Sequence, residues 1–201
     1  IKYGQGKIIN EPEFRFLECN GEVTCRSLPM SFKFSNQRTF VEDVVFTLNK
    51  EGKIDCLSFG LNKPAVDDIM NQTSWNDTVR NVLINFLESY KTAYALKRYD
   101  YINSIFSDDA LIITGSVGQA MSKQAVKYTR QTKSEYMKKL QHIFRSSEFI
   151  NLRFADNQVR KSGVGGEIYG IQIKQDYFSS SYGDTGYLFL MVDLNNPKEP
   201  V

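Results

Sequence analysis

The spacing of apolar positions along this chain changes near residue 75. Before that point, short segments of strand length alternate between apolar and polar residues, and turn sequences such as Asn-Gly and Asn-Lys-Glu-Gly separate them. The segments cover residues 13–19, 22–34, 40–48 and 53–60. The pattern predicts a meander of antiparallel strands over about the first sixty residues.

After this point the apolar positions recur with the period of a helix. The residues that share one face are Val79, Val82, Leu83, Phe86, Leu87, Tyr90 and Tyr94. This stripe predicts an amphipathic helix of about five turns over 77–96. Ser74 or Asp77 is expected to cap its first turn.

The rest of the chain predicts two further helices and then strands. The helices are expected at 98–106 and 132–147, with a buried strand in DDALIITG between them, and three strands at 149–161, 166–178 and 186–194. This order predicts the α+β class, with a curved antiparallel sheet that wraps around helices packed on one face. The last strand, GYLFLMVDL, is apolar on both faces, so its outer side must be covered.

Two parts of the chain are similar at a separation of 145 residues. Gly21-Glu22-Val23 aligns with Gly166-Glu167-Ile168, and Val44-Val45-Phe46 aligns with Phe189-Leu190-Met191. The pattern favours an internal repeat, in which residues 1–62 are the C-terminal half of a preceding unit that lacks its helices. The alternative is that two unrelated meanders share a generic alternation.

The second unit resembles the nuclear transport factor 2-like (cystatin-like cone) superfamily, which includes polyketide-cyclase-like and ketosteroid-isomerase-like proteins. The resemblance covers about residues 75–201 and depends on the helix at 77–96, the segment YALKRYDYINSIFSDDALIITG, the helix at 132–147 and the strands after it. It is a resemblance to uncharacterised secreted bacterial members, which implies an extracellular, periplasmic or cell-envelope location.

The resemblance and the repeat together predict three parts. These are a partial β-meander over 1–62, a linker over 63–76, and a cone-shaped domain over 77–201 that lacks the last strand of the family's sheet. We therefore expect the chain to be a piece of a longer tandem protein. In one version of this hypothesis the strand at 53–60 fills the vacant sheet edge, in cis or from a neighbouring molecule.

Composition limits the classes of partner. The chain has 201 residues, of which 41% are hydrophobic and 24% charged, with a net charge of +2. Lys and Arg are scattered among Asp and Glu, whereas a nucleic-acid interface needs a concentrated basic face. No apolar run approaches the roughly 20 residues that a membrane span requires. We expect neither nucleic-acid binding nor a membrane span.

The three cysteines indicate neither a disulfide framework nor a metal site. Their number is odd, and no C-x-x-C or Cys/His cluster is present. An Asn-Gly hairpin would place Cys19 opposite Glu22 and Cys25 opposite Phe16, so these two cysteines are not partners across the strands. We expect free cysteines, no metal and no cofactor.

A catalytic histidine is also not indicated. The only histidine, His142, lies on the polar side of its helix and is expected to be solvated. Without it the chain cannot build a Ser/His/Asp or Cys/His nucleophile system.

Four residues are candidates for a pocket inside the cone. Tyr90, Tyr94 and Tyr169 could present hydroxyls to a ligand, or they could be ordinary core residues. Asp193 shares its strand parity with three apolar residues. If that parity faces the pocket, Asp193 would be a desolvated carboxylate with a raised pKa, as a general base requires. The alternative is that the strand becomes polar at its end.

The sequence therefore supports two hypotheses of different classes. The first is a non-catalytic ligand-binding or assembly module of a secreted or envelope bacterial protein, whose partner is a small molecule, a sister domain, or a second copy bound through the sheet face. The second is an isomerase, dehydratase or cyclase that uses Asp193 with Tyr90 or Tyr94. A closed, polar-tipped cavity above about 300 Å³ would favour a ligand. A cavity filled with aromatic side chains would oppose an enzyme.

Overall fold

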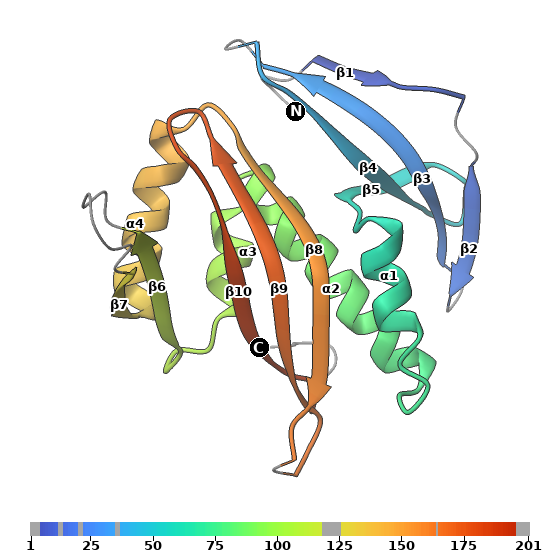
Figure 1. Ribbon diagram of the computed structural model, residues 1–201. Coiled ribbons are helices and arrows are strands. Elements are labelled where there is room, and N and C mark those ends of the chain that lie inside the picture. The colour runs from blue at the N-terminus through green and yellow to red at the C-terminus, as the bar shows by residue number, and fades with distance from the viewer. Residues whose placement is uncertain are drawn as a thin grey trace.

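The computed structural model describes residues 5–11, 14–19, 22–34, 37–117, 126–163 and 165–195. The described residues have the α+β architecture, with antiparallel sheets of five, three and two strands and with helices between and beside them (Figure 1). None of the described helices combines the length and the apolar character that crossing a bilayer requires.

The first sheet is formed by the N-terminal strands. They are β1 (Gln5–Ile8), β2 (Arg15–Cys19), β3 (Glu22–Lys33), β4 (Thr39–Leu48) and β5 (Ile54–Phe59). The strand order is β1-β3-β4-β5, and β2 also pairs with β3. Because β5 pairs with β4, it does not fill an edge of the second sheet in the same molecule.

The helices follow the first sheet. They are α1 (Lys63–Met70), α2 (Asp77–Ala95) and α3 (Tyr99–Ile105), and α4 (Lys133–Ser146) comes after the hairpin of β6 (Leu111–Val117) and β7 (Val126–Thr132). The side chain of Asn76 caps α2 by accepting a hydrogen bond from the Val79 backbone at 2.8 Å. The expected caps, Ser74 and Asp77, were therefore wrong, because Asn76 is the residue with the extended backbone that a cap needs.

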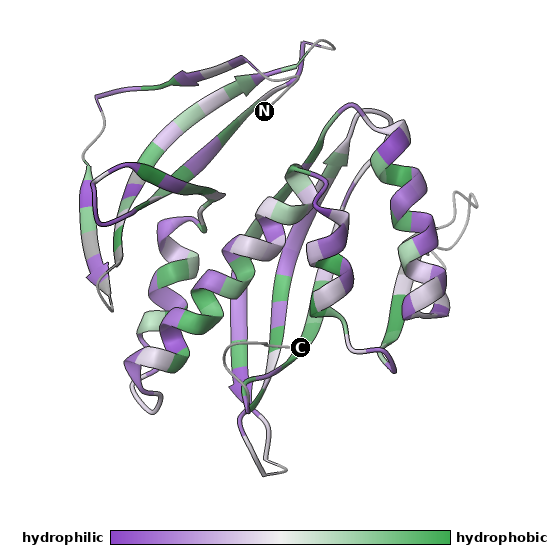
Figure 2. Cartoon of the chain, turned by 180° about the vertical axis from the view of Figure 1, so that it is seen from behind, coloured by the Kyte–Doolittle hydropathy of each residue, from purple (hydrophilic) through white to green (hydrophobic). Residues whose placement is uncertain are grey.

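The second sheet closes the chain. It is formed by β8 (Ile150–Lys161), β9 (Ile168–Ser179) and β10 (Gly183–Asp193), in the order β10-β9-β8. The sheet is curved, and α2 and α3 lie behind it in Figure 1 and in front of it in Figure 2. The larger hydrophobic core lies between this inner face and the helices.

Helix α2 is buried between the two sheets. Its apolar stripe, which includes Leu83, Leu87 and Tyr90, belongs to the larger core. Residues on another side of the same helix, Glu88 and Thr92, bond to the first sheet and the segment after it. A smaller cluster of Phe32, Val44 and Phe59 packs on Ala95 and Leu96 at the end of the helix. The expected linker, 63–76, contains α1, which packs on α2 and β8.

The two sheets share a pairing register at one end of the β3–β4 and β9–β10 ladders. Val23 of β3 pairs with Leu48 of β4, and Ile168 of β9 pairs with Asp193 of β10. Each member of the second pair lies 145 residues after its counterpart in the first. The registers differ beyond a β-bulge in the β3–β4 ladder, between Cys25 and Leu28. The β9–β10 ladder is continuous.

Candidate functional site

Four tyrosines face the core on the concave side of the second sheet. Tyr90 and Tyr94 lie on α2, Tyr136 on α4 and Tyr177 on β9. The rings of Tyr90 and Tyr94 have centroids 4.8 Å apart, and the hydroxyls of Tyr94 and Tyr136 are 2.5 Å apart. The sequence-predicted pair Tyr90 and Tyr94 is therefore brought together, with Tyr136 as an unpredicted third member.

This tyrosine cluster stays neutral. Burial raises the pKa values of Tyr90 and Tyr94 well above the ordinary range, and Tyr136 adds to both shifts. Burial, with a smaller contribution from Tyr136, raises the pKa of Tyr177 to about 12. The groups that shift Tyr90 and Tyr94 are other tyrosines and not a carboxylate, so the cluster can share protons in hydrogen bonds but holds no base.

Aromatic side chains fill the space around this cluster. The ring of Phe154 lies 6.3 Å from that of Tyr90, and the ring of Phe144 lies 6.0 Å from that of Tyr94. Tyr90 and Tyr94 are 4% and 3% exposed. These values describe packed core residues.

Tyr169 makes different contacts from the other two predicted tyrosines. It is 1% exposed, and its ring meets that of Trp75 edge-on at 5.2 Å. Its hydroxyl donates to Glu167 at 2.5 Å, and burial together with this bond raises its pKa to about 12. The hydroxyl of Tyr169 is therefore not part of the hydrogen bond between Tyr94 and Tyr136.

Asp193 lies on the outer face of the second sheet. Its carboxylate accepts hydrogen bonds from the backbone N–H of Asn195 at 2.9 Å and from the Asn195 side chain at 2.5 Å. Asp193 lies on the same side of the strand as Phe189, and this side faces solvent. Its neighbour Val192 is buried on the inner face. Asp193 therefore does not face the pocket as a general base would have to, since Asp193 and Tyr94 lie on opposite sides of the sheet.

His142, Cys25 and Cys56 are placed as the sequence predicts, whereas the side chain of Cys19 lies outside the described residues. His142 is exposed. Cys25 and Cys56 are free thiols, and Cys25 pairs across the hairpin with Phe16. Burial raises the pKa of the Cys25 thiol, which makes it a poor nucleophile. In the described part of the chain, no group of three or more His, Cys, Asp or Glu residues could hold a metal ion.

A buried ionic contact joins the first sheet to α2. Glu88 of α2 accepts hydrogen bonds from both terminal nitrogens of Arg26 on β3. The same carboxylate accepts the backbone N–H of Leu61 at 2.9 Å. Three donors therefore satisfy a side chain that would be costly to bury alone.

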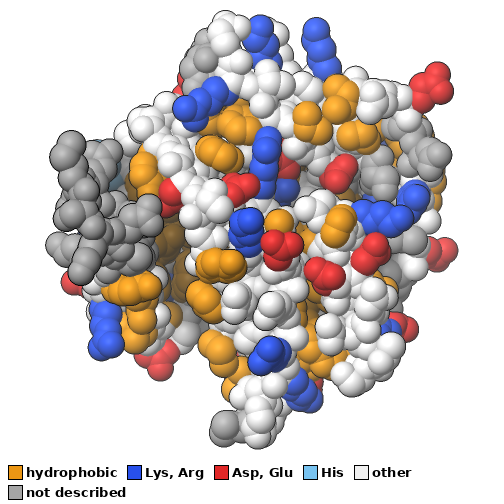
Figure 3. All heavy atoms as spheres, viewed as in Figure 1, with side chains coloured by type: hydrophobic (Ala, Val, Ile, Leu, Met, Phe, Trp, Pro, Cys, Tyr) orange, Lys and Arg blue, Asp and Glu red, His pale blue; other side chains and the backbone are white. Residues whose placement is uncertain are grey.

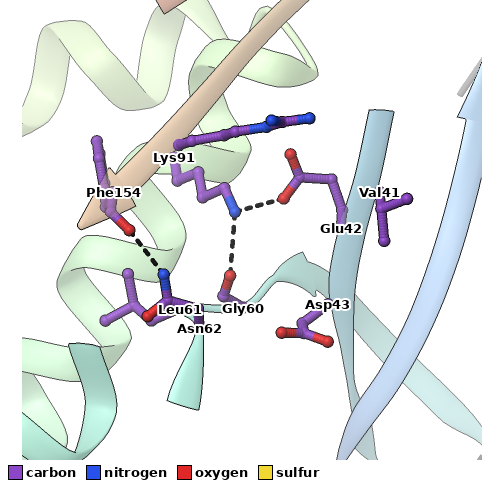
Figure 4. A pocket seen from close by; sticks show the side chains of 9 residues that line it. Val41, Glu42, Asp43, Gly60, Leu61, Asn62, Lys91 and Phe154 are labelled. Atoms are coloured by element: carbon purple, nitrogen blue, oxygen red, sulfur yellow. Dashed lines mark hydrogen bonds and ion pairs between the residues drawn. The ribbon is translucent and has the colours of Figure 1, made fainter. Parts of the chain in front are cut away.

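A groove of about 440 Å³ lies beside a second buried ion pair (Figure 4). Lys91 of α2 pairs with Glu42 of β4 and donates to the carbonyl of Gly60 at 3.1 Å. The other carboxylate oxygen of Glu42 accepts the side-chain amide of Asn151 on β8. Because Lys91 and Glu42 neutralise one another and Asn151 binds the same carboxylate, these side chains form a structural junction between the first sheet, α2 and β8.

Arg153 also lines this groove. Its guanidinium lies 5.7 Å from the ring centroid of Phe40 and 6.0 Å from that of Phe178. Phe149 also contacts Phe40, with centroids 5.2 Å apart. An aromatic and cationic cluster therefore links β4 to β8 and β9.

The most exposed apolar surface of the second sheet lies on its outer face. Tyr187, Phe189 and Met191 of β10 are 64%, 67% and 66% exposed. In Figure 3, which views this face, hydrophobic side chains gather over β10, and charged side chains lie nearer the centre of the view. The first sheet does not cover these three side chains, so this outer strip on β10 is the candidate functional site.

Comparison with protein-family models, with curated protein sequences and with solved structures gives no match for this chain.

Proposed function

We propose that this chain is a non-catalytic assembly module of the nuclear transport factor 2-like type, which associates with a second copy through the outer face of the β8–β9–β10 sheet. The observation that supports it is the outer strip of Tyr187, Phe189 and Met191, each of which is about two-thirds exposed. The resemblance of the sequence to secreted bacterial proteins supports an extracellular or envelope location for the assembly.

The outer strip is suited to a two-fold interface. Phe189 lies at its centre, and Tyr187 and Met191 lie two residues away on either side. A two-fold axis near Phe189 would set each Tyr187 against the partner's Met191, so the same patch serves both subunits. Two curved sheets can pack face to face in this way, with their inner side chains interdigitated.

The expected affinity follows from the size of the strip. Full burial of a Phe or Met side chain contributes roughly 1.5–3 kcal/mol, so six such side chains contribute on the order of 10 kcal/mol. Association itself costs about 4–15 kcal/mol, which is of the same order. With an association cost at the low end of this range, the net free energy is about −6 kcal/mol, so we expect a weak, reversible dimer with a dissociation constant of roughly 40 µM.

The packed interior supports assembly over catalysis. The tyrosines that the enzyme hypothesis requires are surrounded by aromatic side chains, and Asp193 bonds to Asn195 on the other side of the sheet. In the described part of the chain, in contrast, the three large apolar side chains of the outer strip remain exposed.

The test is the substitution Phe189→Lys at the centre of the strip. Light scattering at about 100 µM protein is expected to show a dimer for the unmodified chain and a monomer for the variant. The reason is that the two-fold axis would bury two lysine charges, one from each subunit, against each other. The matched control is Leu111→Lys on β6, where the native side chain is 64% exposed. The control should remain dimeric. A dimer that survives Phe189→Lys, or one that both variants abolish, would contradict the proposal.

A further inference from the structure

The groove beside the Lys91–Glu42 pair has the size of a small-molecule site. Its lining residues come from β4, β8, α2 and residues 60–62, so four separate segments meet around it. Its volume of about 440 Å³ lies near the lower end of the range for small-molecule sites, roughly 300–1,000 Å³. A groove of this size suits a compact ligand rather than a large cofactor.

Arg153 brings an unpaired cation to this groove. It lies on β8 and is exposed, and its guanidinium lies over the rings of Phe40 and Phe178. Contacts of this kind use the flat face of a guanidinium, whereas its N–H donors point outward in the plane of the group. Within the described residues these donors form no hydrogen bond and no ion pair. A guanidinium held in this way can bind a carboxylate through two parallel hydrogen bonds.

Asp43 brings an unpaired anion to the same groove. Its backbone carbonyl accepts the N–H of Gly60 at 2.6 Å, which holds this part of β4 beside the groove. Its side chain is half-buried, and no described residue donates a hydrogen bond or a positive charge to its carboxylate. In Figure 4 this carboxylate lies apart from the Lys91–Glu42 pair. It is therefore available to a positively charged group of a ligand.

The charges of Arg153 and Asp43 are not neutralised by each other or by the buried pair. Arg153 and Asp43 form no ion pair with each other, although both line the groove. Lys91 and Glu42 satisfy one another, and Asn151 occupies the second oxygen of Glu42. The groove thus presents one available charge of each sign. A simple anion would be repelled by Asp43 and a simple cation by Arg153, whereas a ligand that carries both charges can satisfy both residues.

We propose that this groove binds a small zwitterion with a carboxylate and an ammonium group, as in an amino acid. The guanidinium of Arg153 binds the carboxylate, and the carboxylate of Asp43 binds the ammonium group. Because both side chains keep contact with water, the expected dissociation constant is on the order of 1 mM. This site goes beyond the proposed assembly, since β8 and β10 are opposite edges of the three-stranded sheet.

The first experiment is an NMR titration of the unmodified chain. The probes are glycine, 4-aminobutyrate and 6-aminohexanoate, which differ in the distance between their two charges, each added to about 20 mM at constant pH and ionic strength. At least one zwitterion should shift the amide signals of Gly60 and Leu61, which line the groove, along a saturable curve. Butyrate and butylamine, which carry one charge each, should bind at least about tenfold more weakly than the best zwitterion.

The second experiment repeats the titration with variants of the two charged residues. Arg153→Gln and Asp43→Asn should each raise the dissociation constant of the best zwitterion at least about tenfold. The matched controls are Arg160→Gln on β8 and Asp55→Asn on β5, whose native side chains are exposed and do not line the groove. The controls should leave the dissociation constant within about twofold of its original value.

Each result decides for or against the site. Saturable binding that requires both charges of the probe and both Arg153 and Asp43 supports the proposal. It is overturned if no zwitterion shifts the groove amides, if butyrate or butylamine binds equally well, if either groove variant keeps its affinity, or if the controls lose as much. The titration is repeated with Phe189→Lys present. Binding that persists while the dimer is lost shows that the groove acts within one molecule, and binding that is lost with the dimer would contradict the site described.

Discussion

Lys91 of α2 and Glu42 of β4 form an ion pair in which the side chains are only 7% and 5% exposed. The two residues lie 49 positions apart, and Asn151 of β8 donates to the same carboxylate. One buried contact therefore joins the first sheet, the long helix and the second sheet. Because a buried charge is stable only while its partners are present, this contact ties the position of the first sheet to that of the helix.

We predict that Lys91→Met destabilises the protein by about 3–5 kcal/mol, since it leaves the Glu42 carboxylate buried without its cation. Urea denaturation would measure this loss. The matched control is Lys133→Met, which removes the cation from Asp108, a carboxylate whose side chain is 99% exposed. The control should lose no more than about 1 kcal/mol. Equal losses in the two variants would show that the Lys91–Glu42 pair is not buried as described.

The hydroxyl pair of Tyr94 and Tyr136 should be energetically coupled. Tyr94→Phe leaves the Tyr136 hydroxyl without its partner and should cost about 1–2 kcal/mol, whereas adding Tyr136→Phe should cost little more. Denaturation of the two single variants and the double variant gives the coupling energy. Tyr187→Phe, at an exposed ring, serves as the control. If the stability losses of the two single variants add up in the double variant, the hydroxyls of Tyr94 and Tyr136 do not hydrogen-bond to each other.

Stability should fall at alkaline pH because of the buried tyrosines. The pKa values of Tyr169 and Tyr177 are raised to about 12 by burial and by neighbouring groups. An unfolded tyrosine has a pKa of about 10, so the folded state holds these protons more tightly. Their contribution is complete below about pH 10 and is lost as the pH rises towards 12. Urea midpoints across this range would show the decline, and Tyr177→Phe should reduce it. Phenolate absorbance that appears in one step near pH 10 in the folded protein would contradict the prediction.

The capping box at the start of α4 should be visible in a titration. The backbone N–H and the hydroxyl of Thr132 hold the pKa of Glu135 below its ordinary value. The stabilisation of the helix is therefore present above the pKa that Glu135 has in the unfolded chain. It is lost as the pH falls through the lower pKa that Glu135 has in the folded protein. Thr132→Val removes the hydroxyl and should raise the Glu135 pKa measured by carboxyl NMR, whereas Thr132→Ser should leave it low. An unchanged pKa in the valine variant would exclude the hydroxyl as a cause.

The periodicity of the sequence predicts most elements of the fold because each has an apolar face of its own. The helix expected at 132–147 is α4, Lys133–Ser146, and the strands expected at 149–161 and 166–178 are β8 and β9. β7 was missed, since its sequence, VKYTRQT, is largely polar and pairs with β6 at the surface of the described chain. β7 packs beside α4 but contains only two apolar residues, Val126 and Tyr128, which are too few for a periodic signal.

The second buried side of α2 could not be predicted from the sequence. Glu88, Lys91 and Thr92 are each at most 6% exposed, yet residues of these types usually mark a solvated helix face. They are buried because Arg26 and Glu42, which lie far away in the sequence, reach them from the first sheet. Pairing of this kind depends on tertiary structure, and one sequence contains no signal for it.

The candidate site was predicted in part. The apolar character of both faces of GYLFLMVDL indicates a surface that needs a cover, and the structure leaves Tyr187, Phe189 and Met191 exposed. Tyr136 could have been grouped with Tyr94, since both lie on the inner faces of their helices. The parity argument for Asp193 left open which face of the strand is the inner one, and only the packing of Val192 against the core decides it.

The most direct test of the assembly proposal is sedimentation equilibrium on the unmodified chain over a wide range of concentration. The proposal predicts a mass that rises from 23.1 kDa towards twice that value as the concentration passes through the micromolar range. A mass that stays at 23.1 kDa at every concentration would contradict it.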